Sequence, residues 1–369
     1  MRRKLVRWIP AIAAPALVAA AVGLASIPAQ ADIPVKTPAQ VVALAAGSKV
    51  SAFSGTLSQT SDLGLPSLPA VPESAAGPSS GDAATQLSAL TGPHTARLYV
   101  AGPQRQRLQV MSGGNEQDFV HDGTTAWLYD SATLTATRVT APAGARDPAG
   151  QTPAPGNAMT PQQLADRVLA AITPSTRVSV AGTTRVAGRD AYRLELQPKT
   201  SATLVDLVSI DVDAATGMAL GVDITARGQA TPALAVTFTS VSLRTPPASR
   251  FDFTPPADAT LRHVTLPGEQ GSARQGQAPT IVGSGWTSVV ELPGGTAADL
   301  LSGAAEAPTG TQGDAGAEQQ AVLNGLTRAV AGGRLLSTSL VNVYLTDTGR
   351  VFAGAVPPES LYAAARQAQ

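Results

Sequence analysis

The sequence feature that most constrains the fold is a hairpin signal in residues 116–130, which read EQDFVHDGTTAWLYD. Asp122 and Gly123 separate two runs that are rich in apolar, aromatic and β-branched residues. Asp-Gly tolerates the positive φ angles that a type I′ turn requires. A turn at this dipeptide predicts two antiparallel strands in which Phe119 pairs with Ala126, and it predicts a positive φ at Gly123.

The predicted hairpin is apolar on both of its faces. Side chains alternate across a strand, so one face carries Phe119, Ala126 and Leu128. The other face carries Val120, Thr125, Trp127 and Tyr129. A sheet with one face in water shows a cleaner alternation of apolar and polar residues. We therefore expect the second face to meet a helix, another sheet or a ligand.

The order of the remaining elements indicates an α+β fold. Two segments, residues 37–40 (TPAQ) and 160–163 (TPQQ), have the N-cap, first-turn proline and glutamine of a helix start. Short strands joined by turns follow each helix. This order predicts one large antiparallel sheet with two helices gathered on one side. A polar, glycine-rich linker at residues 265–280 then precedes a small C-terminal α+β domain, residues 281–369.

The first 31 residues have the pattern of a secretory signal peptide. Four basic residues precede an apolar run at residues 9–25, and Ala29-Gln30-Ala31 forms a small-x-small cleavage site. The alternative is an uncleaved membrane anchor, but the run contains Pro10 and Pro15 and is shorter than the ~20 apolar residues of a span. We expect a protein that is exported to the cell envelope or the medium and is soluble after cleavage.

Composition argues against several classes of function. Lys and Arg number 26, as do Asp and Glu, so no basic surplus favours nucleic acid. The three histidines, which we expect at surface or turn positions, lack the spacing of metal ligands. Asp211-Val212-Asp213 is better explained by a strand that ends in an Asp-rich turn than by phosphotransfer. We expect no enzyme activity, no catalytic residues, no cofactor and no metal.

Four segments carry a family resemblance, and they occur in the family's order. They are the hairpin with its Asp-Gly turn and Trp-x-Tyr strand, residues 186–199 (VAGRDAYRLELQPK), residues 210–217, and Phe253-Thr254-Pro255-Pro256. Together they resemble the periplasmic lipoprotein carriers of the LolA type, whose fold the RseB-type stress sensors share. The resemblance covers residues 32–264. It implies a curved half-barrel closed by helices around a hydrophobic cavity that receives acyl chains.

Two functions follow from this resemblance. One is a carrier that shields the acyl chains of a lipid or lipoprotein. The alternative is an RseB-like sensor or regulatory module that binds a membrane protein such as an anti-sigma factor. The apolar sheet face also admits ordinary helix-on-sheet packing. Of these we expect the cavity, and its predicted lining residues are Phe53, Leu57, Leu98, Leu108, Val120, Trp127, Tyr129, Leu194 and Leu196.

The N-terminal pattern predicts cleavage after Ala31, because the small residues at positions 29 and 31 fit a signal peptidase site. Intact-mass analysis of the protein recovered from the medium or the cell envelope should give a chain that begins at Asp32. A mature species that retains Met1 would contradict this prediction.

Overall fold

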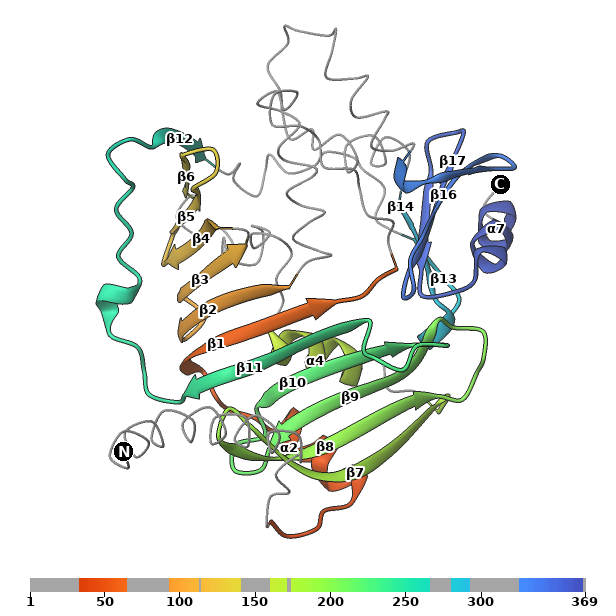
Figure 1. Cartoon of the computed structure of the whole chain (residues 1–369), viewed down its shortest axis with the longest axis horizontal. Coiled ribbons are helices and arrows are strands. Elements are labelled where there is room, and N and C mark those ends of the chain that lie inside the picture. The colour runs from red at the N-terminus through yellow and green to blue at the C-terminus, as the bar shows by residue number, and fades with distance from the viewer. Residues whose placement is uncertain are drawn as a thin grey trace, which may run out of the picture.

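The computed structural model describes residues 33–64, 93–112, 114–140, 160–170, 174–265, 280–292 and 325–367. These residues form one large sheet and one small sheet (Figure 1). The predicted signal peptide and nearly all of the predicted linker lie outside the described residues.

The large sheet has twelve strands in the order β12-β6-β5-β4-β3-β2-β1-β11-β10-β9-β8-β7. The strands before α4 are β1 (Ala52–Ser61), β2 (His94–Ala101), β3 (Arg105–Ser112), β4 (Asn115–Asp122), β5 (Thr125–Asp130) and β6 (Thr135–Thr140). Those after it are β7 (Thr176–Val186), β8 (Arg189–Pro198), β9 (Val205–Asp213), β10 (Ala219–Ala226), β11 (Leu234–Ser242) and β12 (Thr260–Thr265). All neighbours pair antiparallel except β12 and β6, which are parallel. The sheet is open, as the predicted fold class requires, because β7 and β12 remain at its two ends.

The two predicted helices that precede strands are present, and both begin at capping boxes. In α2 (Pro38–Ala46) the Thr37 hydroxyl accepts a hydrogen bond from the Gln40 backbone, and the Gln40 side chain returns one to Thr37. Thr160 and Gln163 make the same exchange at α4 (Pro161–Ala170). Both helices pack against β7–β11 and bury Val41 and Leu164 in a cluster with Leu194 and Ile210 of the sheet.

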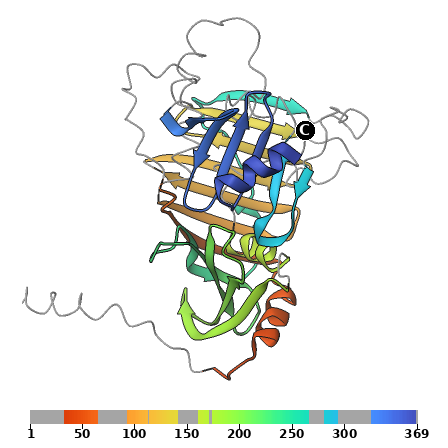
Figure 2. The ribbon, with the colours of Figure 1, turned by 90° about the vertical axis from the view of Figure 1, so that its right-hand side faces the viewer.

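The small sheet has six strands in the order β13-β14-β18-β17-β16-β15. They are β13 (Thr280–Val282), β14 (Val289–Leu292), β15 (Arg328–Val330), β16 (Gly333–Ser337), β17 (Asn342–Thr346) and β18 (Val351–Gly354). The last helix, α7 (Pro358–Gln367), covers the face of this sheet that points away from the large sheet (Figures 1 and 2). Tyr362 of α7 contacts Tyr344 edge to face, with ring centroids 4.9 Å apart.

The two sheets make contact at one end of β7–β9. The Trp286 indole N–H donates to the Thr176 hydroxyl over 2.8 Å, and the Thr203 hydroxyl donates to the Ala355 carbonyl over 2.7 Å. Leu340, which precedes β17, is buried in the core cluster of the large sheet. The small sheet is therefore docked through both apolar packing and hydrogen bonds.

The central hairpin forms, but its predicted register was wrong by two residues. Asp122 pairs with Thr125, and Phe119 pairs with Leu128 instead of Ala126. The turn residues are Gly123 and Thr124, and only Gly123 has positive φ, at 61°. A glycine at the first central position is typical of a type II′ turn. Because the side-chain period is two, a shift of two residues leaves every side chain on its predicted face.

We predict that Gly123→Val lowers the free energy of unfolding by about 1–2 kcal/mol, since a β-carbon disfavours the left-handed region. An added Cβ would meet no atom within 4 Å, so backbone strain is the expected cause. The matched control is Thr124→Val, which changes the neighbouring turn residue without a positive φ. Urea unfolding of both variants measures the difference, and equal midpoints would contradict the turn assignment.

Candidate functional site

The large sheet has an inner face, which we define as the face that α2 and α4 cover. Val236 of β11 packs in the same cluster as the two helices, and Phe238 lies two residues further on the same face. Phe238 pairs with Leu57 of β1, so the inner face continues from β11 into the first half of the sheet. Leu57 is followed across the strands by Ala96 and Val110.

Six of the nine predicted cavity residues lie on this inner face. Phe53, Leu57, Leu98 and Leu108 belong to a cluster that also contains Phe119 and Ala126, whereas Leu194 and Leu196 belong to the cluster under the helices. Leu194 and Leu196 are fully buried, at 0% exposure, against Val41 and Leu164. For these two leucines the alternative of ordinary helix-on-sheet packing describes the structure.

The other three predicted cavity residues lie on the opposite, outer face, so the grouping of all nine was wrong. Val120 pairs with Trp127 of β5 and with Arg107 of β3. The neighbouring residue Phe119, which lies on the inner face, pairs with Leu128 and Leu108. The backbone of the sheet separates the two sets, so they cannot line one cavity. Sequence alternation had divided the hairpin correctly, but it does not indicate which of two apolar faces will meet the helices.

On the outer face, Trp127 and Tyr129 pack against a segment that crosses the sheet. This strap, residues 243–259, connects β11 to β12 and includes the Phe-Thr-Pro-Pro motif. Phe253 of the strap contacts the Trp127 and Tyr129 rings, with centroid distances of 5.5 and 6.0 Å. The aromatic residues of the Trp-x-Tyr strand therefore fasten the strap, which passes along one side of the sheet in Figure 1.

Arginines complete the attachment of the strap. Arg107 forms a bidentate ion pair with Asp118, at 2.6 and 3.1 Å, and donates to the Arg250 carbonyl over 3.2 Å. The Arg250 guanidinium stacks over Tyr99, and Arg105 lies over Phe251. Burial raises the pKa of the Asp118 carboxyl above its usual range, although the hydrogen bond and charge of Arg107 act in the lowering direction.

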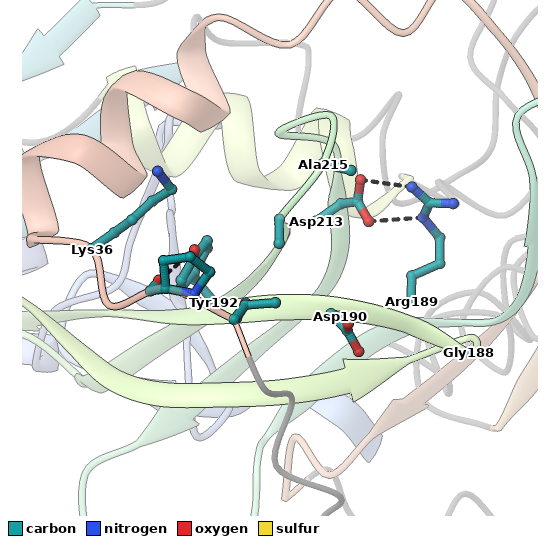
Figure 3. Close-up of a pocket in the computed structure, with 10 residues that line it drawn as sticks. Lys36, Gly188, Arg189, Asp190, Tyr192, Asp213 and Ala215 are labelled. Atoms are coloured by element: carbon teal, nitrogen blue, oxygen red, sulfur yellow. Dashed lines mark hydrogen bonds and ion pairs between the residues drawn. The ribbon is translucent and has the colours of Figure 1, made fainter.

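An open groove of about 510 Å³ lies where the N-terminal segment crosses the large sheet (Figure 3). The Tyr192 hydroxyl donates to the Pro34 carbonyl over 2.7 Å and holds this segment in place. The Lys36 ammonium lies 6.0 Å from the centroid of the Tyr192 ring. On the other side of the groove, Arg189 forms two hydrogen bonds with Asp213, at 2.8 and 2.9 Å. Sequence reasoning missed this groove, since its walls come from three separate parts of the chain.

Both carboxylates of Asp211-Val212-Asp213 are held by arginines. Asp211 pairs bidentately with Arg193 at 2.9 Å, and Asp213 with Arg189. Asp213 also accepts hydrogen bonds from the backbone and the hydroxyl of Thr216, which closes the turn after β9. This geometry agrees with the predicted strand that ends in an Asp-rich turn.

The described histidines differ from expectation in their burial. His94 at the start of β2 and His121 in β4 are buried, and the His121 imidazole lies 2.8 Å from the Gly123 carbonyl, whereas His263 in β12 is exposed. Asp122 and Thr124 of the turn are exposed, but the His121 side chain is buried because it lies on the inner face opposite Ala126. Within the described ranges, no group of three or more His, Asp or Glu is arranged to hold a metal ion. No helix in the same ranges has the length and hydropathy of a membrane span.

Comparison with known proteins finds similarity in solved structures. Pseudomonas aeruginosa MucB, in its complex with MucA, is 14% identical with a TM-score of 0.42, and the match covers 88% of this chain and 96% of that chain. A LolA-superfamily protein from Nitrosomonas europaea is 11% identical with a TM-score of 0.24, covering 59% of this chain and 99% of that one. No family model and no curated protein matches the sequence. The second of these proteins is described as a member of the LolA superfamily.

The Asp213 ion pair predicts a pH-dependent contribution to stability. Burial raises the pKa of the Asp213 carboxyl, but hydrogen bonds from Arg189 and Thr216 outweigh it, and the net pKa is below its usual value. A lowered folded-state pKa contributes stability above the unfolded pKa of about 3.9, and this stability is lost as pH falls through the folded value.

We therefore expect Asp213→Asn to destabilise the protein at pH 7 and to lose this effect progressively below about pH 4. Denaturant unfolding at a series of pH values measures the difference from wild type. The matched control is Asp258→Asn, which removes an exposed carboxylate between the strap motif and β12. A difference between Asp213→Asn and wild type that is independent of pH would contradict the assignment.

Proposed function

We propose that this chain is an exported, non-enzymatic carrier that shields acyl chains of a lipid or lipoprotein on the inner face of β1–β6. The observation that supports this proposal is the composition of the two apolar clusters. The cluster on β7–β11 includes residues of α2 and α4, but the cluster around Phe53, Leu57, Leu98 and Leu108 has no helical member among the described residues. These four side chains are only 4–7% exposed, so an elongated apolar ligand would bind by taking the place of their present neighbours.

Acyl chains provide enough free energy for this mode of binding. Burial of one CH₂ group is worth about 0.8 kcal/mol, so a chain of about ten carbons gains several kcal/mol after ordering costs. The β1–β6 half of the inner face spans several strands, which provides length for such a chain. The two carboxylates of Asp211-Val212-Asp213, the motif weighed against phosphotransfer, are paired with Arg193 and Arg189.

The second candidate function is a regulatory module that binds a membrane-anchored protein at the cell envelope. The docked small sheet favours it, because a carrier of acyl chains alone does not require a second sheet. The contacts through Trp286, Thr203 and Leu340 hold the two sheets together, so that both can contribute to one protein-binding surface. The apolar inner face would then be the part of the module that senses a lipid-modified partner.

We predict that Leu128→Gln weakens acyl-chain binding by about fivefold or more, which corresponds to a loss of about 1 kcal/mol of apolar transfer energy. Leu128 is half-buried on the inner face beside Phe119. The matched control is Tyr129→Gln on the same strand, whose side chain is on the outer face and should leave binding unchanged.

The measurement is a titration of delipidated protein with a fluorescent fatty acid, after native mass spectrometry has tested the purified protein for bound lipid. Trp127 is unsuitable as the reporter because it contacts the strap on the outer face. The carrier proposal fails if no lipid copurifies and wild type shows no saturable binding. If Leu128→Gln and Tyr129→Gln lose the same amount of acyl-chain affinity, the acyl chain does not bind on the inner face.

A further inference from the structure

The two edges of the large sheet differ in how they are protected against pairing with another chain. The β7 edge has a bulge between Val180 and Gly182, where Gly182 has a φ of 126°, and β7 also contacts α2. Bulges of this kind twist an edge and interrupt its ladder. The β12 edge is regular from Thr260 to Thr265, and all six of its residues are exposed. Among the described residues, no strand pairs with its open side.

The open side of β12 presents a defined set of backbone groups. The Thr260 N–H donates to the Leu134 carbonyl over 2.7 Å, so Thr260 directs its backbone groups toward β6. In a parallel ladder the residues alternate in direction. Arg262 and Val264 therefore also point toward β6, while Leu261, His263 and Thr265 direct their N–H and C=O groups outward. These outward groups are a template for one further strand.

The side chains around this edge are apolar and basic. Leu261 is 54% exposed and Val264 is 45% exposed, one on each face of the strand. Arg262 and Arg138 are exposed as well, and no ion pair joins either guanidinium to a described carboxylate. Arg138 lies on the outer face of β6, and its guanidinium stacks at 5.8 Å over Trp127 of β5, on the side of β6 opposite to β12, which leaves Arg262 as the arginine of the edge strand itself.

We propose that β12 binds an extended acidic segment of another protein, which adds as a thirteenth strand to the large sheet. The outward N–H and C=O groups of Leu261 and His263 would supply the main-chain hydrogen bonds. On the outer face an apolar residue of the segment would cover Leu261, and on the inner face a carboxylate would meet Arg262. Cross-strand pairs of opposite charge stabilise such an addition. The proposal does not rest on acyl-chain binding, because it uses the strand edge and not the inner face.

A second copy of the chain is a less suitable occupant. Two β12 strands related by a twofold axis would run antiparallel, and because β12 reads Thr-Leu-Arg-His-Val-Thr, no register of this pairing brings a carboxylate of β12 to Arg262, while pairing centred on Arg262 would place it opposite its own copy. Like charges directly opposite each other destabilise a strand pair. An acidic segment has the complementary charge, so it is the occupant that the exposed side chains favour.

The test uses the full mature chain and separates backbone pairing from side-chain effects at His263. His263→Pro removes the outward N–H but leaves the bonds between β12 and β6 in place, which is how proline is tolerated on edge strands. His263→Ala removes the imidazole and keeps the N–H, so it is the matched control. Circular dichroism and a thermal scan establish that both variants remain folded.

The probe is a fluorescent peptide of about nine residues in which valine and glutamate alternate, and binding is followed by anisotropy. We expect His263→Pro to weaken binding by at least about tenfold and His263→Ala to change it by less than about twofold. Arg262→Glu should also weaken binding, and a peptide with lysine in place of glutamate should not bind. If His263→Pro fails to fold, a glutamate peptide with N-methyl groups on alternate amides replaces it, since it cannot complete the ladder.

The proposal is overturned if wild type shows no saturable binding of the glutamate peptide up to about 1 mM. It is also overturned if the proline variant or the N-methylated peptide binds as well as its unmodified counterpart. The last experiment measures the oligomeric state of the wild type by sedimentation. A dimer that His263→Pro converts to a monomer would assign the edge to a second copy of the chain and would reject the acidic partner.

Discussion

The pairing of β1 with β11 is the interaction on which the rest of the large sheet depends, because it joins strands from the two ends of the domain. Leu57, near the start of the domain's sequence, pairs with Phe238, near its end. Thr239 forms a bulge beside Thr56. Gly55 is needed at this junction, since a Cβ there would lie 2.6 Å from the Ser240 carbonyl and 2.7 Å from the Phe238 ring. A bulge bends its strand, so this junction contributes to the curvature that brings both apolar clusters onto one inner face.

The outer face is organised by arginine–carboxylate pairs instead of apolar packing alone. Arg107–Asp118, Arg189–Asp213 and Arg193–Asp211 each bury a carboxylate almost completely and leave the guanidinium partly exposed. A buried carboxylate without its partner would be strongly destabilising. These pairs therefore specify the sheet register and the strap position, and they engage the acidic residues that would otherwise suggest catalysis or metal binding.

The three proposed or observed surfaces of the large sheet are physically separate. The inner face of β1–β6 is apolar, the groove beside Tyr192 carries mixed charge, and the β12 edge offers unpaired backbone groups. Because each surface uses a different property of the sheet, the apolar ligand and the protein partner that we propose would occupy different parts of the chain. This separation is relevant to both candidate functions, since a regulator that senses lipid needs two such surfaces.

The sequence by itself determined the local structure, because capping boxes, turns and side-chain alternation depend on neighbours only a few residues apart. Thr37 and Thr160 begin helices as expected, Gly123 has positive φ, and the hairpin faces are those that alternation predicted even though the register moved by two residues. Only the tertiary structure decided which face of the hairpin would be inner. That choice depends on Leu57 meeting Phe238 and on Phe253 returning to Trp127, contacts between residues more than a hundred positions apart. Local patterns do not encode such contacts, and for this reason the sequence-based prediction placed Trp127 and Tyr129 in one set with Phe53, Leu57, Leu98 and Leu108, although the two aromatic residues lie on the opposite face of the sheet.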